Sequence, residues 1–439
     1  MKKNIIISVV KLIIMGFLAK IISTIAKIIT ARKIGIESMS IYSLTLPTMV
    51  LMLNLAQAGF PTAISKLIAQ NRQKTFKIMV SSTILTTLLN LIIACIYFPL
   101  VPTIGKHLLH NSLTIPTLYC IGCILPLVSF GGLLKGYFVG IEEVEKSSYC
   151  QISEEIARIL FIIFFIDMVA NQSPSFLAFF AMCSMLIGEI ASIIHMLLSM
   201  NIHWKDKFKN IKTALNEETK EYHKMILQIA LPTTSTRIIG SVAYFFEPIL
   251  FTFLMIKSGM SASTTTIEYG IVTGYIMPLL LLPGFFANAF SLALLPRMSK
   301  AVAQKKYSYA KKLLIYFTGA SFFVGLIFSL TLTLAPQFFM NLLYHHTQGY
   351  EFIQKYGLLM VIYYIEAPLS TAMISLSLEK HILLDSILCN GAKIFAYLIF
   401  IPIFKTDGLM IGVLVSVYLT VIINLYFITK RFKLLFKNS

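Results

Sequence analysis

The sequence predicts an all-helical integral membrane protein with about twelve transmembrane helices, arranged as two related bundles of six. Three observations support this fold class. Hydrophobic residues make up 57% of the chain, charged residues make up 13%, and the mean hydropathy is +0.80. The apolar residues are gathered in runs of about 20 or more, the length that a helix needs to cross a bilayer. Short motifs also recur half a chain apart, which is typical of membrane proteins built from a duplicated bundle.

Two sequence motifs each recur after nearly the same number of residues, which indicates the duplication. The motif Ser-Lys-x-x-Ala-Gln at residues 65–70 recurs 234 residues later at 299–304. Ala-Arg-Ile at 157–159 is matched by Ala-Lys-Ile at 392–394, a shift of 235 residues. Ala-Arg-Ile and Ala-Lys-Ile each place a basic residue inside an apolar run. A duplicated unit is therefore favoured over coincidence.

The apolar runs are expected to be helical, because only helices and closed barrels satisfy the backbone in lipid and these runs are too long for barrel strands. They cover roughly residues 5–31, 40–68, 78–100, 113–137, 148–168, 175–199, 224–256, 267–296, 312–340, 356–378, 382–403 and 408–429. The expected domains are an N-terminal lobe (1–200), an amphipathic cytoplasmic linker helix (201–223) and a C-terminal lobe (224–439). Breaks are expected where prolines interrupt the runs, for example at Pro47, Pro126, Pro283 and Pro368.

The distribution of Lys and Arg predicts the orientation. The loops on one side hold few of them, at Arg32, Lys33, Lys106, Lys257, Lys355 and Lys405. The other side holds most of the rest together with both termini, so both termini of this multi-pass membrane protein are expected in the cytoplasm. The net charge of +18 does not predict nucleic-acid binding, because the basic residues lie between apolar runs rather than on one solvated face.

The motifs of common enzymes are missing from the sequence. It has no phosphate-binding loop, no His-Glu-x-x-His and no nucleophile elbow. The six cysteines lie in or beside apolar runs, and Cys120-x-x-Cys123 lacks the second pair of a metal site. We therefore expect no enzyme activity, no cofactor and no metal, with transport driven by an ion gradient, the membrane potential or the substrate gradient.

Four residues inside the runs are predicted to bind substrate. Lys20 and Lys27 are seven residues apart and therefore share one helix face. Arg237 and Tyr244 share a face in the run 224–256, which is the repeat partner of the first run. Ionisable residues in a membrane normally face a cavity or each other. Two equivalent helices are thus expected to point cations toward one central cavity, the alternative being ion pairs that only fix packing.

Five further residues are predicted to act in coupling or gating: Glu247, Glu366, Glu189, Arg158 and Lys393. Arg158 and Lys393 lie in equivalent helices, where pairing with Glu154, Glu189 or Glu366 is the more expected role. Glu247 has no basic neighbour in its own helix. It is the candidate that takes up a proton or cation during transport, unless it pairs with a lysine of the first run.

Several short motifs resemble those of one family of membrane transporters. They are Ala-Gly-Phe-Pro-Thr-Ala-Ile-Ser-Lys at 58–66, Gly-Tyr-Phe-Val-Gly at 136–140, Gln-Ile-Ser-Glu-Glu-Ile-Ala-Arg at 151–158, Leu-Pro through Arg at 231–237, and Leu-Leu-Pro-Gly through Leu-Pro at 281–296. With these motifs, most of the chain resembles the polysaccharide-biosynthesis and stage V sporulation protein B group of lipid-linked sugar flippases. Their superfamily also holds the multidrug and toxin exporters and the lipid II flippases.

The resemblance implies a multidrug-and-toxin-exporter-like fold that flips lipid-linked oligosaccharides or peptidoglycan precursors by alternating access. The implied partners are a polyprenyl-pyrophosphate-linked sugar, membrane lipid and a coupling ion, either proton or sodium, and a monomer is expected. The product would serve cell-wall, polysaccharide or spore-cortex synthesis. Lys20, Lys27 and Lys66 stand where such proteins often have Arg or Lys, and each would hold a pyrophosphate as a point charge. Many sporulation-type members have two further helices, which would form a groove for the lipid tail.

Two other functions are consistent with the same sequence. A cation-coupled multidrug antiporter of the same fold would need an acidic cavity, and the deep charges favour an anionic substrate only slightly. A non-transporting membrane scaffold for cell-wall or spore-coat enzymes would leave the polar face of the first helix unexplained. Replacing Lys20 and Lys27 with Gln separates these functions, because it should abolish a flippase and hardly affect a scaffold.

Overall fold

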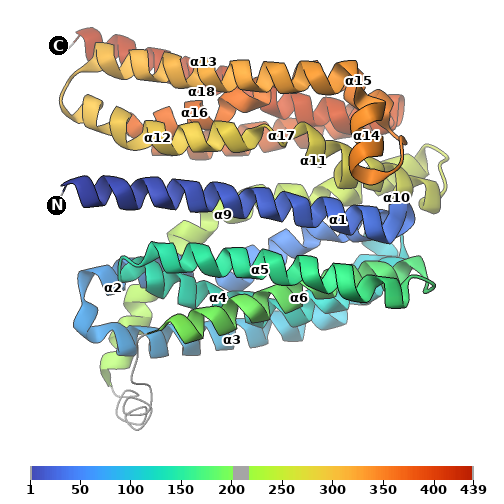
Figure 1. The fold of residues 1–439 in the computed structure, drawn as a ribbon, viewed down its shortest axis with the longest axis horizontal. Coiled ribbons are helices and arrows are strands. Elements are labelled where there is room, and N and C mark those ends of the chain that lie inside the picture. Colours follow the sequence, from blue (N-terminus) through green and yellow to red (C-terminus); the bar gives the residue numbers. More distant parts are fainter. Residues whose placement is uncertain (1, 201–216, 438–439) are drawn as a thin grey trace. The chain divides into compact units, whose positions relative to one another are not determined.

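The computed structural model describes residues 2–200 and 217–437 (Figure 1). The described residues form helices joined by short turns, with no β-strand among them. They fall into two compact units, Met1–Phe245 and Phe246–Ser439, whose boundary lies inside helix α9 (Glu217–Lys257). The predicted all-helical fold is confirmed. The lobe boundaries stay a prediction, and residues 201–216 of the expected linker helix lie outside the described residues.

In its described residues, the first unit contains six α-helices and the first part of α9: α1 (Lys2–Gln57), α2 (Phe60–Gln70), α3 (Thr75–Thr103), α4 (Ile115–Gly140), α5 (Val144–Phe165) and α6 (Pro174–Ser199). Helix α5 packs against α1 and α6, and α4 packs against α2 and α6. Their apolar faces enclose a core around Ile64, Ile68 and Phe138, each of which is fully buried. The unit is thus held by helix-on-helix packing.

Helix α1 contains a predicted span and most of the next one. Inside it, Gly35 takes a non-helical conformation with a φ of 75° and a ψ of 173°. Glycine tolerates a positive φ because it has no Cβ. The chain therefore bends at Gly35, and α1 consists of two helical limbs.

The motif at 58–66 forms the turn from α1 to α2. Ala58 and Gly59 both have a positive φ, and a Cβ on Gly59 would lie 2.7 Å from the Ala230 carbonyl oxygen of α9. In α4, a Cβ on Gly136 would lie 2.6 Å from the carbonyl oxygen of Pro61. The glycines of the motifs at 58–66 and 136–140 thus permit close approach between α2 and its neighbours.

The second unit contains the end of α9 and nine further helices: α10 (Ala262–Gly270), α11 (Met277–Leu280), α12 (Gly284–Ala303), α13 (Tyr307–Leu334), α14 (Pro336–Tyr344), α15 (Tyr350–Tyr356), α16 (Tyr363–Ser375), α17 (Glu379–Phe404) and α18 (Thr406–Lys437). Helices α17 and α18 are joined at Lys405 and lie side by side (Figure 1). Helix α12 packs against α13 and α16. Leu294, Met298 and Met373 are fully buried in the core of this unit.

Among the described residues, nine helical segments are long and apolar enough to cross a membrane, or ten if the bent pair Ala262–Leu280 and Gly284–Ala303 is one span. This number differs from the predicted twelve for identifiable reasons. The two limbs of α1 are continuous with α2 in the single segment Leu18–Gln70. Helix α5, expected as a span, carries five charged residues between Glu145 and Arg158. The number twelve therefore stays a prediction.

The prolines interrupt the helices less often than expected. The break at Pro283 is confirmed, since α11 and α12 are separated there and the chain bends by 50°. The helices continue through Pro47 in α1, Pro126 in α4 and Pro368 in α16. Each of these prolines removes one backbone hydrogen bond. At those three positions the surrounding packing keeps the helix continuous.

Candidate functional site

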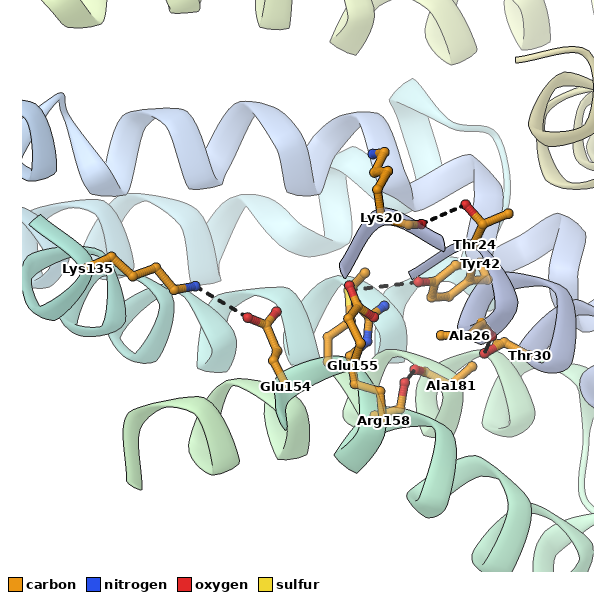
Figure 2. Close-up of polar contacts among 12 residues, drawn as sticks. Lys20, Thr24, Ala26, Thr30, Tyr42, Lys135, Glu154, Glu155, Arg158 and Ala181 are labelled. Carbon is orange, nitrogen blue, oxygen red and sulfur yellow. Dashed lines mark hydrogen bonds and ion pairs between the residues drawn. The ribbon is translucent and has the colours of Figure 1, made fainter. Parts of the chain in front are cut away.

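The two predicted substrate-binding lysines lie on the first limb of α1. The side chains of Lys20 and Lys27 are exposed, and neither forms an ion pair with another described residue. The Thr24 hydroxyl between them donates a hydrogen bond of 3.1 Å to the Lys20 carbonyl oxygen (Figure 2). Lys33 of the same helix is different, because its ammonium group lies 2.8 Å from Asp167. We call Lys20 and Lys27 the α1 lysine pair.

The α1 lysine pair borders charged residues of α5. Helices α1 and α5 pack against each other. Lys27 is close enough to be repelled by Lys20 and Arg158 and attracted by Glu155. In Figure 2, Lys20 points away from Glu155 and Arg158. Of the two lysines, Lys27 thus lies within electrostatic range of a buried ion pair, while Lys20 points away from it.

Arg237 and Tyr244, the other predicted substrate-binding residues, lie on α9 within the first unit. The Arg237 side chain is exposed and Tyr244 is half-buried. Between them, the Ser241 hydroxyl donates a hydrogen bond of 3.1 Å to the Arg237 carbonyl oxygen. Their spacing of seven residues places both on one helix face. That this face and the α1 lysine pair line one cavity stays a prediction.

Arg158 forms a buried ion pair within α5. Its Nη1 lies 3.0 Å from Oε2 of Glu155, and the two side chains are 11% and 6% exposed. The partner expected from the sequence, Glu154, instead pairs with Lys135 of α4. Gly188 of α6 makes room for the guanidinium stem, because a Cβ there would collide with the Arg158 side chain. Arg158 therefore has a structural partner one helical turn away.

A second ionic cluster joins α4, α5 and α6. Lys135 Nζ lies 3.3 Å from Oε2 of Glu154 and 3.9 Å from Oε1 of Glu189, and Figure 2 shows the first of these pairs. Glu189 is buried, and a Cβ on Gly131 would collide with its carboxylate. Lys135 lies two residues before the end of the predicted run 113–137. The apolar residues that continue to Gly140 were the signal that Lys135 lies inside a helix.

Glu247 is the centre of a buried polar cluster in the second unit. Lys393 Nζ of α17 lies 2.5 Å from Oε2 of Glu247. The Tyr397 hydroxyl donates to the same oxygen at 2.7 Å, and the Tyr269 hydroxyl of α10 donates to Oε1 at 3.4 Å. Gly412 of α18 gives the Tyr397 ring its space. The basic partner of Glu247 is thus Lys393 of α17. The sequence had predicted ion pairs between Lys393 and other carboxylates.

Two carboxylates form a further polar group in the second unit. Glu366 of α16 is half-buried and close enough to Asp385 of α17 for electrostatic repulsion. Asp385 is buried, and the Cys389 thiol donates to its Oδ1 at 3.1 Å. Neither carboxylate forms an ion pair with another residue of the described ranges. Asp385 was not among the predicted site residues, although it is the one acidic residue within the run 382–403.

The thiols of unit one show close packing of α4 on α6. The Sγ atoms of Cys120 and Cys183 lie 3.6 Å apart. All six cysteines lie in the described ranges and are free. In the part of the chain that the structure describes, no group of three or more His, Cys, Asp or Glu residues is arranged to hold a metal ion.

A family model of polysaccharide biosynthesis proteins matches residues 3–302, which is more than half of the chain. The chain belongs to this family. Among curated relatives of this polysaccharide biosynthesis protein, stage V sporulation protein B of Bacillus subtilis is 28% identical over 395 residues, or 89% of this chain and 76% of that protein. Lipid II flippase MurJ of the same organism is 26% identical over 283 residues, or 58% of this chain and 51% of MurJ. The family placement predicted from the sequence is confirmed.

Solved structures show the fold of this polysaccharide biosynthesis protein. An inward-facing multidrug resistance MATE family transporter of the MOP superfamily has a TM-score of 0.72 and 16% identity, covering 95% of this chain and 96% of that one. A MOP superfamily transporter from Pyrococcus furiosus has a TM-score of 0.63 and 16% identity, covering 97% and 96%. At these identities the likeness concerns the fold. Family, relatives and apolar helices together support a multi-pass membrane transporter.

Proposed function

We propose that this member of the polysaccharide biosynthesis family is a flippase. It moves a lipid-linked oligosaccharide or peptidoglycan precursor across the bacterial cytoplasmic membrane by alternating access. The name of one relative, lipid II flippase MurJ, supports this substrate class. The name of another, stage V sporulation protein B, supports a role in sporulation. The product would serve cell-wall, polysaccharide or spore-cortex synthesis.

The observation that carries the proposal is the difference between paired and unpaired cations within the helices. Arg158 and Lys393 are buried against carboxylates. Lys20 and Lys27 are exposed and have no ion-pair partner among the described residues. A lysine at the centre of a bilayer costs roughly 3 kcal/mol on insertion scales. The α1 lysine pair therefore requires water or an anion, and a pyrophosphate headgroup is such an anion.

In the proposed mechanism, Lys20, Lys27 and Arg237 bind the pyrophosphate, and Tyr244 borders the sugar. The ammonium groups are point charges that follow the phosphates as the lobes rearrange, while Arg237 offers a two-pronged contact. The polyprenyl tail stays in the lipid. Binding neutralises the cations, which lowers the cost of closing the cavity around them.

Coupling and gating are proposed at the buried carboxylates and their partners. A proton or sodium ion that binds Glu247 would compete with Lys393 for the same carboxylate. The Glu366 carboxylate has no basic partner among the described residues. The Glu189 carboxylate has Lys135 as its basic partner. Arg158 would act as a gate beside the α1 lysine pair. Each site changes charge when an ion binds, and this would favour one arrangement of the lobes over the other.

The proposal also includes the orientation, the lobes and the oligomeric state that the sequence predicts. Both termini lie in the cytoplasm, the lobes are residues 1–200 and 224–439, and the protein works as a monomer. The excess of Lys and Arg in the loops on the side of the termini supports this orientation. Labelling of single introduced cysteines at the chain ends from either side of the membrane tests it.

The function is tested with purified protein in liposomes that contain a fluorescent undecaprenyl-pyrophosphate sugar. Wild-type protein should make inner-leaflet lipid accessible to an added quencher, while liposomes with heat-inactivated protein should not. If the protein moves no such lipid but lowers ethidium accumulation in cells, it is a multidrug antiporter. Loss of both activities would favour a membrane scaffold.

A further inference from the structure

One end of the second unit carries a dense set of unpaired lysines. Their side chains are all exposed, and none forms an ion pair with another described residue. We call this set the C-unit lysine cluster: Lys305, Lys306, Lys311, Lys312, Lys433 and Lys437. Its members come from the α12–α13 turn, the start of α13 and the end of α18.

Contacts between the helices place these lysines at one end of the unit. Tyr307, the first residue of α13, packs edge-on against Phe436 of α18 with ring centroids 6.3 Å apart. Met298 near the end of α12 and Phe432 near the end of α18 belong to one apolar core. Figure 1 shows the α12–α13 turn beside the C-terminal end of α18. The lysines of the cluster therefore lie together at one end of this helix bundle.

The positive charge of this end is not compensated by nearby acidic residues in the sequence. Residues 284–350 and 408–439 contain no Asp or Glu, and Glu379 at the start of α17 is followed directly by Lys380. The repeat-related end of the first unit is different. There, Arg72 pairs with Glu142 at 3.0 Å, and Lys146 pairs with Glu143 at 2.8 Å.

Exposed apolar side chains border the cluster. Tyr309 and Tyr316 of α13 expose most of their surface, as does Ile315 between the lysines and the middle of the helix. On α18, Leu434 and Phe436 are exposed beside Lys433 and Lys437. Tyrosines and lysines flanking an apolar helix surface are typical of the membrane–water interface. A soluble polyanion would not require this apolar border, but a lipid with a charged headgroup and acyl chains matches both parts.

We propose that the C-unit lysine cluster binds the headgroups of anionic phospholipids in the leaflet that it faces. The ammonium groups contact the lipid phosphates, and the acyl chains lie along Ile315 and Leu434. Juxtamembrane lysines are attracted to anionic lipid surfaces, and the attraction grows with the number of lysines. This site is separate from the proposed transport of a lipid-linked sugar, because it anchors the second unit to ordinary membrane lipid.

The test measures lipids retained by the full-length protein after mixing with equal amounts of phosphatidylglycerol and phosphatidylcholine, by native mass spectrometry. Two quadruple variants are compared, K305Q/K306Q/K433Q/K437Q in the second unit and R72Q/K74Q/K77Q/K146Q in the first. The first variant should lose the preference for phosphatidylglycerol by about tenfold or more, because several unpaired cations are removed. The second should change by less than about twofold, because Glu142 and Glu143 compensate two of its cations, Arg72 and Lys146. The K305R/K306R/K433R/K437R variant should keep the preference.

A measurement on the unaltered protein makes the test independent of variant folding. The preference for phosphatidylglycerol should fall when salt rises from about 0.1 M to 1 M, because the Debye length shrinks from about 10 Å to 3 Å. A preference that is insensitive to salt, or equal in the two Gln variants, would overturn the proposal. Displacement of the lipid by millimolar inorganic phosphate would also overturn it, since the cluster would then bind free anions rather than lipid.

Discussion

Arg158 and Lys393, which the sequence predicts to occupy equivalent helices, are neutralised in different ways. Arg158 pairs with Glu155 of its own helix, three residues earlier. Lys393 of α17 pairs with Glu247 of α9, which is 146 residues away. The first pair adds no link between helices, whereas the second ties two helices of the second unit together. The predicted duplication would therefore give the two cations equivalent positions, although their partners differ in kind.

The surroundings of the two pairs differ as well. Two tyrosine hydroxyls, from Tyr397 and Tyr269, donate to the Glu247 carboxylate in addition to Lys393. Glu155 has a second cation nearby, because Lys27 lies within electrostatic range. Loss of the basic partner should thus leave Glu247 as an isolated buried charge but leave Glu155 partly compensated. This contrast makes the comparison testable.

The largest effect is expected for Lys393→Met. It leaves the Glu247 carboxylate buried without a cation, and breaking a buried ion pair from one side costs about 3–5 kcal/mol. The variant should unfold at a clearly lower temperature in detergent, as followed by circular dichroism. Adding Glu247→Gln should restore most of the stability, because the uncompensated charge is removed. A Lys393→Met protein as stable as wild type would show that the pair does not link α9 to α17.

Arg158→Met should destabilise less, by about 2 kcal/mol, because it removes a charged hydrogen bond while Lys27 still attracts Glu155. The same thermal unfolding measurement compares it directly with Lys393→Met. The double variant Arg158→Met/Lys27→Gln should lose more than the two single variants together, since no cation then compensates Glu155. Equal losses for Arg158→Met and Lys393→Met would remove the distinction between the two units.

The smallest effect is expected for Gly131→Ala. The added Cβ collides with the Glu189 carboxylate and moves it from Lys135. Because the carboxylate is the far end of a flexible side chain, the cost should lie at the low end of the range for overpacking, about 1 kcal/mol. Gly319→Ala in α13 is the matched control, because nothing lies within 4 Å of a Cβ at that position. The control should be neutral or slightly stabilising, since alanine favours a helix by about 1 kcal/mol over glycine. Similar melting temperatures for both variants would contradict the packing of Glu189 against α4.

Hydropathy was sufficient to predict the helical membrane fold, because every backbone group in lipid needs an internal partner. It also separated the runs 5–31 and 40–68, and the bend at Gly35 lies in the gap between them, although the helix continues on both sides of the bend. Helical periodicity placed Lys20 and Lys27 on one face, which is a local property. The partners of Arg158 and Lys393 could not be predicted. Glu154 and Glu155 both lie about one turn from Arg158, and Glu247 meets Lys393 only through tertiary packing.

The central claim is that the unpaired cations of α1 hold the anionic headgroup during transport. Its most direct test is the rate of lipid translocation in liposomes by Lys20→Gln/Lys27→Gln, compared with Lys33→Gln on the same helix. Because hydrogen bonds to charged groups contribute about 1.5–3 kcal/mol each, the double variant should be slower by about tenfold or more. Lys33→Gln should keep the wild-type rate, since Lys33 is neutralised by Asp167. Translocation at the wild-type rate by Lys20→Gln/Lys27→Gln would contradict the account.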